Sequence, residues 1–350
     1  MPKIPADKLE TIAATLLQKS GSSEEEAAII ARHSIGANLA GHDSHGIIQI
    51  PTYIDRVKKE HIIPGAEFEI VRETPTTTVI DGHWGWGYVV SERAMQMTID
   101  KAEKSGVAAT TVSHQSHVGR VADYPLMAAE AGMIGMMTAD SGRSPKSVAP
   151  FGGREPRLGT NPISMAMPSN LDGPFFIDMA TSGAAAGKVK LAQSRGTPIP
   201  EGWLVDKDGN PTTDPNLYGN GAVILPLGGA EGHKGYGLSA MVEIFSGILT
   251  GLGFGVEPSG KHNDGVFMAV FKVDAFMDLE EFKREVTDFA TYLKATPTAA
   301  GFDEVLYPGE IEHQRIQKNL AEGVFIEDAT WDKLKALADE YGVTDQLGMS

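Results

Sequence analysis

The chain has 350 residues, 41% of them hydrophobic, so it is long enough for one large domain or two ordinary domains with a substantial core. It carries 46 acidic against 30 basic residues, a formal net charge of -16 that disfavours nucleic acid and anionic membranes as partners. The absence of cysteine excludes disulfides, thiol catalysis and zinc–thiolate sites.

Two amphipathic helices are predicted at the start of the chain. Apolar residues recur at helical spacing up to Gly21, which ends the first helix. Ser23 and Glu26 have the spacing of a capping box, in which each residue satisfies a backbone N–H group of the other. This pattern predicts a second helix, which Gly41 ends.

Helices and strands alternate along the rest of the chain. A third helix is expected over 47–59, with Asp43 or Ser44 able to cap it. Extended segments or strands are predicted over 67–80, 107–112, 133–138, 163–167, 175–179 and 266–273. Further helices are predicted over 88–104, 121–131, 238–252, 279–294, 311–322 and 330–341. We therefore expect a helical layer from both termini around a central, strand-rich α/β body.

Neither of two apolar segments predicts membrane insertion. The N-terminal residues lack the uninterrupted apolar run of a signal peptide, so a cytoplasmic location is expected. The most apolar stretch, 238–252, is interrupted by Glu243 and several glycines and falls short of the ~20 residues that span a bilayer. We interpret it as a buried helix.

Common cofactor and hydrolase motifs are absent, and two segments only imitate them. No three-glycine dinucleotide fingerprint joins a strand to a helix, and the glycines of 251–255 have the wrong spacing. Residues 183–189 imitate a phosphate-binding loop but are one residue short and lack the final hydroxyl, so we predict a turn of small residues there. No serine nucleophile elbow or zinc-protease helix motif occurs.

Two short stretches each place a pair of histidines three residues apart among small and polar residues. His42 and His45 form one pair, and His114 and His117 form the other. Imidazole is the side chain best suited to exchange protons near neutral pH or to bind a metal. The second pair follows a predicted strand and precedes a predicted helix, where α/β proteins often carry their chemistry.

The two pairs support two hypotheses. In the metal hypothesis the four histidines converge on zinc or iron, with Asp43 as a further ligand. In the proton-transfer hypothesis one histidine works with a hydroxyl that orients it and a cation that holds the substrate. Ser44, His45, His117 and Arg120 supply that set. Acid/base chemistry is favoured, because no clear second carboxylate accompanies either pair.

Six motifs occur in the order that marks one family. They are residues 42–46, 116–120, 159–162, 178–182, 233–236 and 308–310. Together they resemble the malate/L-lactate dehydrogenase family of the sulfolactate-dehydrogenase type, over nearly the whole chain. The stretches around His45 and His117 are most similar to the hydroxycarboxylate dehydrogenase branch.

The resemblance implies a fold and an activity. Members are nicotinamide-dependent oxidoreductases that interconvert 2-hydroxy and 2-oxo acids. Their α/β cofactor domain is not a Rossmann fold and has a mixed, largely antiparallel sheet. Homodimers with the active site near the subunit interface are typical. We accordingly expect a discontinuous helical substrate and dimerisation domain, 1–75 with 290–350, and a cofactor domain, 76–289.

The resemblance also assigns roles to individual residues. His117 would accept the proton when a 2-hydroxy acid is oxidised and donate it when the oxo acid is reduced. Ser44 and His45 would orient substrate and nicotinamide, while His42 and His114 support them. The expected substrate contacts are Gln49, Tyr53 and Arg120.

A larger set is expected to bind the cofactor, NAD or alternatively NADP. These residues are small, polar or in tight turns, which lets a pyrophosphate approach the backbone closely. They are His45, Gly119, Arg120, Val121, Ser141, Asp178, Met179, Ala180, Thr181, Ser182, His233, Lys234, Pro308, Gly309 and Glu310. No metal is expected.

One position departs from the family pattern. Many members carry an arginine four residues after the second histidine of the first pair, where it can bind the substrate carboxylate, and this chain has Gln49 there. Glutamine cannot make the charged, bidentate pair. Either Arg120 or an arginine of 141–157 replaces it, or the preferred substrate differs.

Three alternatives stay open. Reduction of a cyclic imino acid would use the same cofactor and proton donor. A metal-dependent hydrolase or lyase would use both histidine pairs. A binding protein without enzymatic activity ranks last, because both clusters are rich in acid/base side chains.

Overall fold

The computed structural model describes residues 3–140, 142–256, 261 and 263–349. Its α-helices are α1 (Ala6–Lys19), α2 (Glu24–Leu39), α3 (Ile50–Lys58), α4 (Gly87–Ser105), α5 (Asp123–Glu130), α6 (Ala186–Arg195), α7 (Gly232–Glu243), α8 (Leu279–Lys294), α9 (Glu310–Glu322), α10 (Asp328–Glu340) and α11 (Thr344–Leu347). The strands are β1 (Lys3–Ile4), β2 (Glu69–Glu73), β3 (Thr77–Gly85), β4 (Val107–Gln115), β5 (Met133–Ala139), β6 (Ile163–Met167), β7 (Phe175–Met179), β8 (Leu204–Val205), β9 (Pro211–Thr212), β10 (Val223–Ile224), β11 (Val266–Lys272) and β12 (Val324–Phe325).

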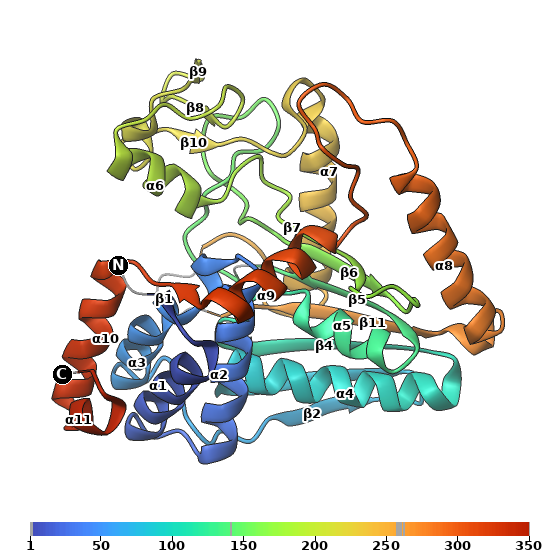
Figure 1. The fold of residues 1–350 in the computed structure, drawn as a ribbon, viewed down its shortest axis with the longest axis horizontal. Coiled ribbons are helices and arrows are strands. Elements are labelled where there is room, and N and C mark those ends of the chain that lie inside the picture. Colours follow the sequence, from blue (N-terminus) through green and yellow to red (C-terminus); the bar gives the residue numbers. More distant parts are fainter. Residues whose placement is uncertain (1–2, 141, 257–260, 262, 350) are drawn as a thin grey trace.

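A seven-stranded mixed sheet forms the centre of the molecule (Figure 1). Its order is β2-β3-β4-β11-β5-β6-β7, in which β3 and β4 are parallel and the other neighbours are antiparallel. A Rossmann sheet is mostly parallel. The expected mixed, largely antiparallel α/β fold is therefore confirmed.

Helices cover both faces of this sheet. Val90 and Ala94 of α4 share a hydrophobic cluster with Val112 of β4 and Val266 of β11. On the other face, α7 continues into a π-helical turn, η5 (Ile244–Ile248), which packs on β5 and β11.

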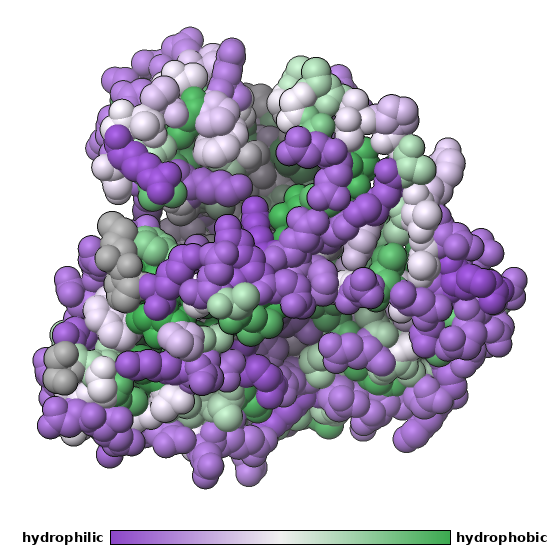
Figure 2. Space-filling model, in the orientation of Figure 1, coloured by the Kyte–Doolittle hydropathy of each residue, from purple (hydrophilic) through white to green (hydrophobic). Residues whose placement is uncertain are grey.

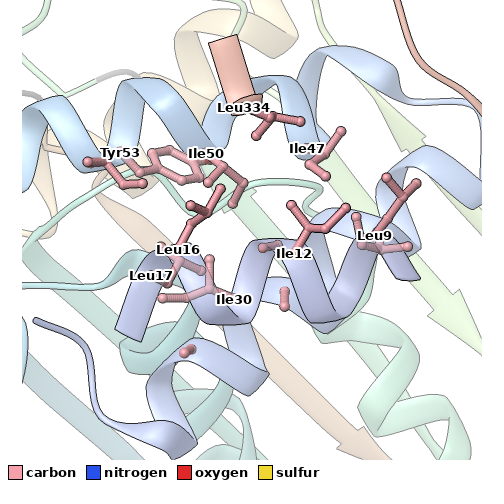
Figure 3. Packing of buried hydrophobic residues seen from close by; sticks show 14 of the residues in the cluster. Leu9, Ile12, Leu16, Leu17, Ile30, Ile47, Ile50, Tyr53 and Leu334 are labelled. Atoms are coloured by element: carbon pink, nitrogen blue, oxygen red, sulfur yellow. The ribbon is translucent and has the colours of Figure 1, made fainter. Parts of the chain in front are cut away.

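The two ends of the chain form one helical layer with a shared core. Leu9, Leu16 and Ile30 of the N-terminal helices pack with Ile50 of α3 and Leu334 of α10 (Figure 3). Strand β1 also pairs with β12, and both termini lie on the same side of the molecule in Figure 1. The predicted helical layer from both termini is confirmed, while its boundaries as a domain stay a prediction.

A small lobe stands apart at the upper left of Figure 1. It contains α6 and the three-stranded sheet β10-β8-β9, and it has its own apolar cluster around Val148, Val189 and Leu204. None of the described helices is long and apolar enough to cross a membrane.

Local signals predicted several helix ends correctly. The Ser23–Glu26 capping box forms, with Glu26 N donating to Ser23 Oγ and Ser23 N donating to the Glu26 carboxylate. Neither Asp43 nor Ser44 caps α3, so that prediction is wrong. Two short 3-10 turns intervene, and the cap position falls to Gln49, which makes no side-chain capping bond.

Three other predictions need correction. The strand expected to end at 112 continues as β4 to Gln115, so His114 lies within it. The small-residue turn at 183–189 leads directly into α6, which begins at Ala186. The segment 238–252 is not a buried helix, since Met241 and Ile248 are about half exposed. Apolar content predicted burial there, but only the packing decides which face is covered.

Candidate active site

A cavity of about 860 Å³ lies where the terminal helical layer, the central sheet and the α6 lobe meet. The face shown in Figure 2 is mostly hydrophilic and is hollowed beside that lobe. The segments that contribute to the cavity wall include 41–45, 117–121, 178–180, 182–185 and 325–327. Both predicted histidine loops therefore reach the same cavity.

Two imidazoles lie stacked in the wall. The ring centroids of His45 and His117 are 5.5 Å apart, and their planes differ by 17°. The Ser44 hydroxyl lies 3.0 Å from Nδ1 of His45. Behind His117, the Tyr53 hydroxyl lies 2.7 Å from Nδ1, and the Tyr88 hydroxyl lies 3.1 Å from that of Tyr53. The orientation of each ring is thus held by a hydroxyl.

The two tyrosines are fully buried and stay protonated. Burial raises the pKa of Tyr53 well above its usual value and raises the pKa of Tyr88 to about 12. The Tyr88 hydroxyl donates to the backbone carbonyl of His45 at 3.3 Å. A chain of hydrogen bonds therefore links the backbone of one histidine loop to the imidazole of the other.

His45 is uncharged at neutral pH. Burial, together with the electrostatic effect of His42, lowers its pKa to about 4. Both effects disfavour the imidazolium form. This imidazole can donate or accept a neutral hydrogen bond, but it does not supply a positive charge at pH 7.

Arg120 places a buried cation in the wall. Its side chain is only 5% exposed, and Nη1 donates to Asp123 Oδ1 at 3.0 Å. The guanidinium lies over the ring of Phe176, with 5.3 Å between its carbon and the ring centroid. Nε is buried without a hydrogen-bond partner among the described residues. An anion that entered the cavity would meet a charge already fixed in place.

The first histidine loop is shaped by a residue of α2. The side chain of Asn38 accepts from Ile47 N at 2.8 Å and donates to Asp43 at 2.8 Å. Gly46 passes so close that a Cβ atom there would lie 2.2 Å from Asn38 Oδ1. Gln49 donates to the Ser44 carbonyl at 2.7 Å, so it fixes the loop and does not line the cavity.

The second loop is held from three sides. Val118 N donates to Asp264 at 3.0 Å, and the Tyr124 hydroxyl donates to the Val118 carbonyl at 2.7 Å. Gly119 has φ +71°, and a Cβ atom there would lie 2.1 Å from the Tyr88 ring. Only glycine combines this conformation with so close an approach.

The end of β7 and the start of α6 form a wall of small side chains. Residues there that line the cavity include Ala180, Ser182, Gly183, Ala184, Ala185 and Gly187, with Asp178 and Met179 just before them. Asp178 accepts from Ala122 N at 2.9 Å, and burial raises its pKa. Thr181 is buried instead, with its hydroxyl donating to the carbonyls of Thr160 and Asn161.

Other expected cofactor residues lie away from this cavity. His233 and Lys234 are exposed in the first turn of α7 and face Glu231, at 3.8 and 3.1 Å. A smaller hollow of about 380 Å³, lined by Phe151 and Gly232 among others, lies beside them. Ser141 lies outside the described residues.

The 308–310 turn also lies outside the cavity wall. Gly309 precedes α9 with φ +96°, and a Cβ atom there would meet the Pro174 carbonyl at 2.4 Å. The Pro308 carbonyl accepts from Phe176 N, and Glu310 pairs with Lys294. This turn anchors α9 against β7, and its predicted contact with a cofactor stays a prediction.

The four histidines do not converge. His114 pairs with Asp81 at 2.8 Å and packs against Trp84, outside the cavity wall. Within the described part of the chain, no group of three or more His, Asp or Glu side chains is arranged to hold a metal ion. The four-histidine arrangement of the metal hypothesis is therefore contradicted by the position of His114.

Several wall residues were not predicted. Asn38, Asp140 and Asp264 line the cavity but belong to no recognisable motif. Lys188 also lines it, at the end of the segment that imitates a phosphate-binding loop. That run of small residues followed by a lysine was the signal that could have placed α6 at the site.

Comparisons with known proteins agree over nearly the whole chain. The family model described as malate/L-lactate dehydrogenase matches residues 4–335. Malate/(S)-sulfolactate dehydrogenase of Methanothermus fervidus is 38% identical, with 94% of this chain and 95% of that protein covered. Hydroxycarboxylate dehydrogenase B of Escherichia coli O157:H7 is 32% identical, with 98% and 96% covered.

A solved structure gives the same result. Malate dehydrogenase from Entamoeba histolytica is 36% identical and superposes with a TM-score of 0.93, covering 98% of each chain. The mixed sheet, the two histidine loops and the match over nearly all residues lead to one conclusion. The chain belongs to the malate/L-lactate dehydrogenase family.

Proposed function

We propose that the protein interconverts a 2-hydroxy acid and a 2-oxo acid by hydride transfer to or from a nicotinamide cofactor. The observation that carries this proposal is the stacked pair of His45 and His117 in a cavity that also contains the buried cation Arg120. Hydride transfer at the carbinol carbon needs a proton carrier for the hydroxyl oxygen and a fixed group for the adjacent carboxylate. The relatives named above are dehydrogenases of such acids.

His117 would exchange the proton through Nε2. Its Nδ1–H can donate to the Tyr53 hydroxyl, Tyr53 to Tyr88, and Tyr88 to the His45 carbonyl. This arrangement suits both directions, because Nδ1 keeps its proton whether Nε2 is protonated or not. Oxidation of the hydroxy acid would protonate Nε2, and reduction of the oxo acid would deprotonate it.

Arg120 would bind the substrate carboxylate. It is a cation in the cavity wall with an unpartnered N–H group, whereas Gln49 uses its amide on the Ser44 carbonyl. The arginines of 141–157 do not line the cavity, and each bonds elsewhere: Arg143 donates to Val256, Arg154 donates to Lys207, and Arg157 pairs with Glu155. Arg120 is therefore the replacement that the geometry favours.

The small-residue wall fits a nicotinamide cofactor, for which NAD is the first expectation. Ala180, Gly183 and Ala184 line the cavity with little or no side chain and so leave room for a bulky group. When bound, the cofactor would supply or accept the hydride. The neutral His45 ring would lie against it and leave the positive charge of the wall to Arg120.

The protein is further proposed to form a homodimer. Met241, Ile244, Phe245, Ile248 and Leu249 form a row of exposed apolar residues on α7 and the turn that follows it. Exposed apolar patches of this kind commonly mark subunit contacts. A second copy of the same chain is the occupant that the family resemblance implies.

The central test is the variant His117→Ala, with His114→Ala as the matched control. We expect turnover of 2-oxo acids to fall ~10²- to 10⁴-fold in His117→Ala. NADH binding, followed by fluorescence quenching, should stay close to that of the unmodified protein. His114 lies outside the cavity wall, so its variant should keep most of the activity.

The assay should include malate, lactate, sulfolactate and aryl-lactates, each with NAD and with NADP. Near-normal turnover in His117→Ala would contradict the assignment of the proton carrier. Failure of the unmodified protein to act on any acid of the panel with either cofactor would contradict the proposed activity itself.

A further inference from the structure

A buried row of alternating charges leads from the helical layer to the cavity. His33 of α2 lies with Nε2 2.6 Å from Glu92 of α4 and with Nδ1 2.9 Å from Asp123 Oδ2 of α5. The other oxygen of Asp123 accepts from Arg120 at 3.0 Å. The order is carboxylate, imidazole, carboxylate, guanidinium, and the last group lies in the cavity wall.

This row is shielded from solvent at the end that reaches the cavity. The side chains of His33, Asp123 and Arg120 are 7%, 12% and 5% exposed. Arg32 also contacts Glu92, but its side chain is 59% exposed. Interactions between charges are screened least where water is excluded. The contacts among His33, Asp123 and Arg120 are therefore the ones that fix the orientation of these side chains.

His33 fixes the orientation in which the Asp123 carboxylate accepts the hydrogen bond from Arg120. A carboxylate that bonds through both oxygens, one to each neighbour, cannot rotate without losing a contact. The His33 ring is itself fixed, since it stacks on Tyr124 at 5.5 Å with 26° between planes and lies 5.6 Å from Tyr88. Removing His33 would leave a buried carboxylate with Arg120 as its remaining charged partner.

We propose that His33 is a positioning residue that holds Arg120, through Asp123, in the orientation that binds the substrate carboxylate. This inference rests on the proposed function. His33 does not line the cavity, and it lies in neither histidine pair. Its effect should appear in the binding of the oxo acid and not in hydride transfer or cofactor binding.

The groups around His33 keep it charged. Burial opposes the imidazolium form, but the hydrogen bonds to Asp123 and Glu92 outweigh burial and raise the pKa of His33 to about 9. The other charged or titratable groups packed nearby are Arg32, Tyr88, Tyr124 and Arg120. At neutral pH the row is complete, and it loses the positive charge of His33 as the pH rises through about 9.

The test is a double-mutant cycle of His33→Gln and Arg120→Gln in the full-length protein, measured by steady-state kinetics at pH 7.5. We expect His33→Gln to raise KM for the oxo acid by about tenfold, a typical effect of losing one hydrogen bond to a charged group. The turnover number and the Kd for NADH should change little. Arg120→Gln should raise KM further, and adding His33→Gln to it should have no additional effect.

Arg32→Gln is the matched control, because it removes a neighbouring charge that also contacts Glu92 but lies at the exposed end. It should leave KM unchanged. The proposal would be overturned if the fold-changes in KM caused by His33→Gln and Arg120→Gln multiplied in the double variant. It would also be overturned if His33→Gln lowered kcat and left KM unchanged.

A second variant tests the proposal if His33→Gln does not fold. Glu92→Gln keeps the contact between His33 and Asp123 but removes one carboxylate that stabilises the imidazolium. KM of the unmodified protein should rise above pH 9, and in Glu92→Gln this rise should begin about one pH unit lower. An unchanged pH profile in that variant would contradict the inference.

The two failures can be told apart. If the unmodified protein acts on no acid, the proposed function has failed. The same double-mutant cycle is then measured by the Tm of thermal unfolding. A joint effect of His33→Gln and Arg120→Gln on Tm that differs from the sum of the single effects supports the linkage, while additive effects overturn it.

Discussion

At the scale of single residues, a hydroxyl behind His117 holds one ring nitrogen, and the proposed function assigns proton exchange to the other. Tyr53 lies 2.7 Å from Nδ1 and is fully buried among apolar residues of the helical core. A neutral hydrogen bond of this kind contributes about 1 kcal/mol. Without it Nδ1 would lose this partner, while the ring would still pack against His45 and the Tyr53 ring.

Tyr53→Phe should therefore reduce turnover by about tenfold while NADH binding stays the same, because it keeps the ring and removes the hydroxyl that bonds both His117 and Tyr88. Tyr307→Phe is the control, since its hydroxyl donates to the Gly173 carbonyl far along the chain from either histidine loop. The measurement is kcat for the oxo acid across pH 5 to 9. Equal turnover in the two variants would show that the hydroxyl of Tyr53 does not orient His117.

At the scale of elements, the loop between β4 and α5 depends on one glycine. Gly119 has φ +71°, and a Cβ atom there would lie 2.1 Å from the Tyr88 ring. Gly152 has a similar φ of +78°, yet nothing lies within 4 Å of the position of its Cβ. Substituting each glycine in turn separates the free-energy cost of the backbone conformation from that of a steric clash.

Gly152→Ala should lower the free energy of unfolding by about 1 kcal/mol, the conformational cost alone. Gly119→Ala should lower it by a larger amount and should also abolish most turnover, because Tyr88 or the loop has to move. Thermal or denaturant unfolding and the NADH assay measure both effects. Similar losses of stability in the two variants would contradict the steric explanation.

At the scale of the whole molecule, the exposed apolar row on α7 bears on assembly. Ile248 is 50% exposed at the end of this row, and Ile63 is 44% exposed outside it. A charge placed within a subunit contact would be desolvated and unpaired, which weakens association strongly. A charge placed on a free surface costs little.

Ile248→Glu should therefore shift the protein from dimer to monomer in light scattering, while Ile63→Glu should leave its mass unchanged. Activity should fall with the dimer if the site lies near the subunit contact. A protein that is monomeric before any substitution would contradict the proposed assembly.

Sequence patterns predicted the parts of the fold that depend on short-range interactions. The helix of 279–294 was predicted with its observed limits, and Ser23 with Glu26 marked the start of α2. Both signals come from residues three or four positions apart, which meet in any helix. The same reasoning failed for 183–189 and for 238–252, where packing against distant segments decides the outcome.

The sequence by itself determined the family from its ordered motifs, and the mixed sheet was implied by that resemblance. Local periodicity placed the two segments that carry His45 and His117. Only the tertiary structure decided which side chains share a cavity. It separated His114 from the other three histidines, gave Gln49 a backbone partner and joined His33 to Arg120 through Asp123. The contacts of His33 with Asp123 and of His114 with Asp81 join elements that lie apart in the chain, and no local pattern encodes a contact that forms only when such elements pack.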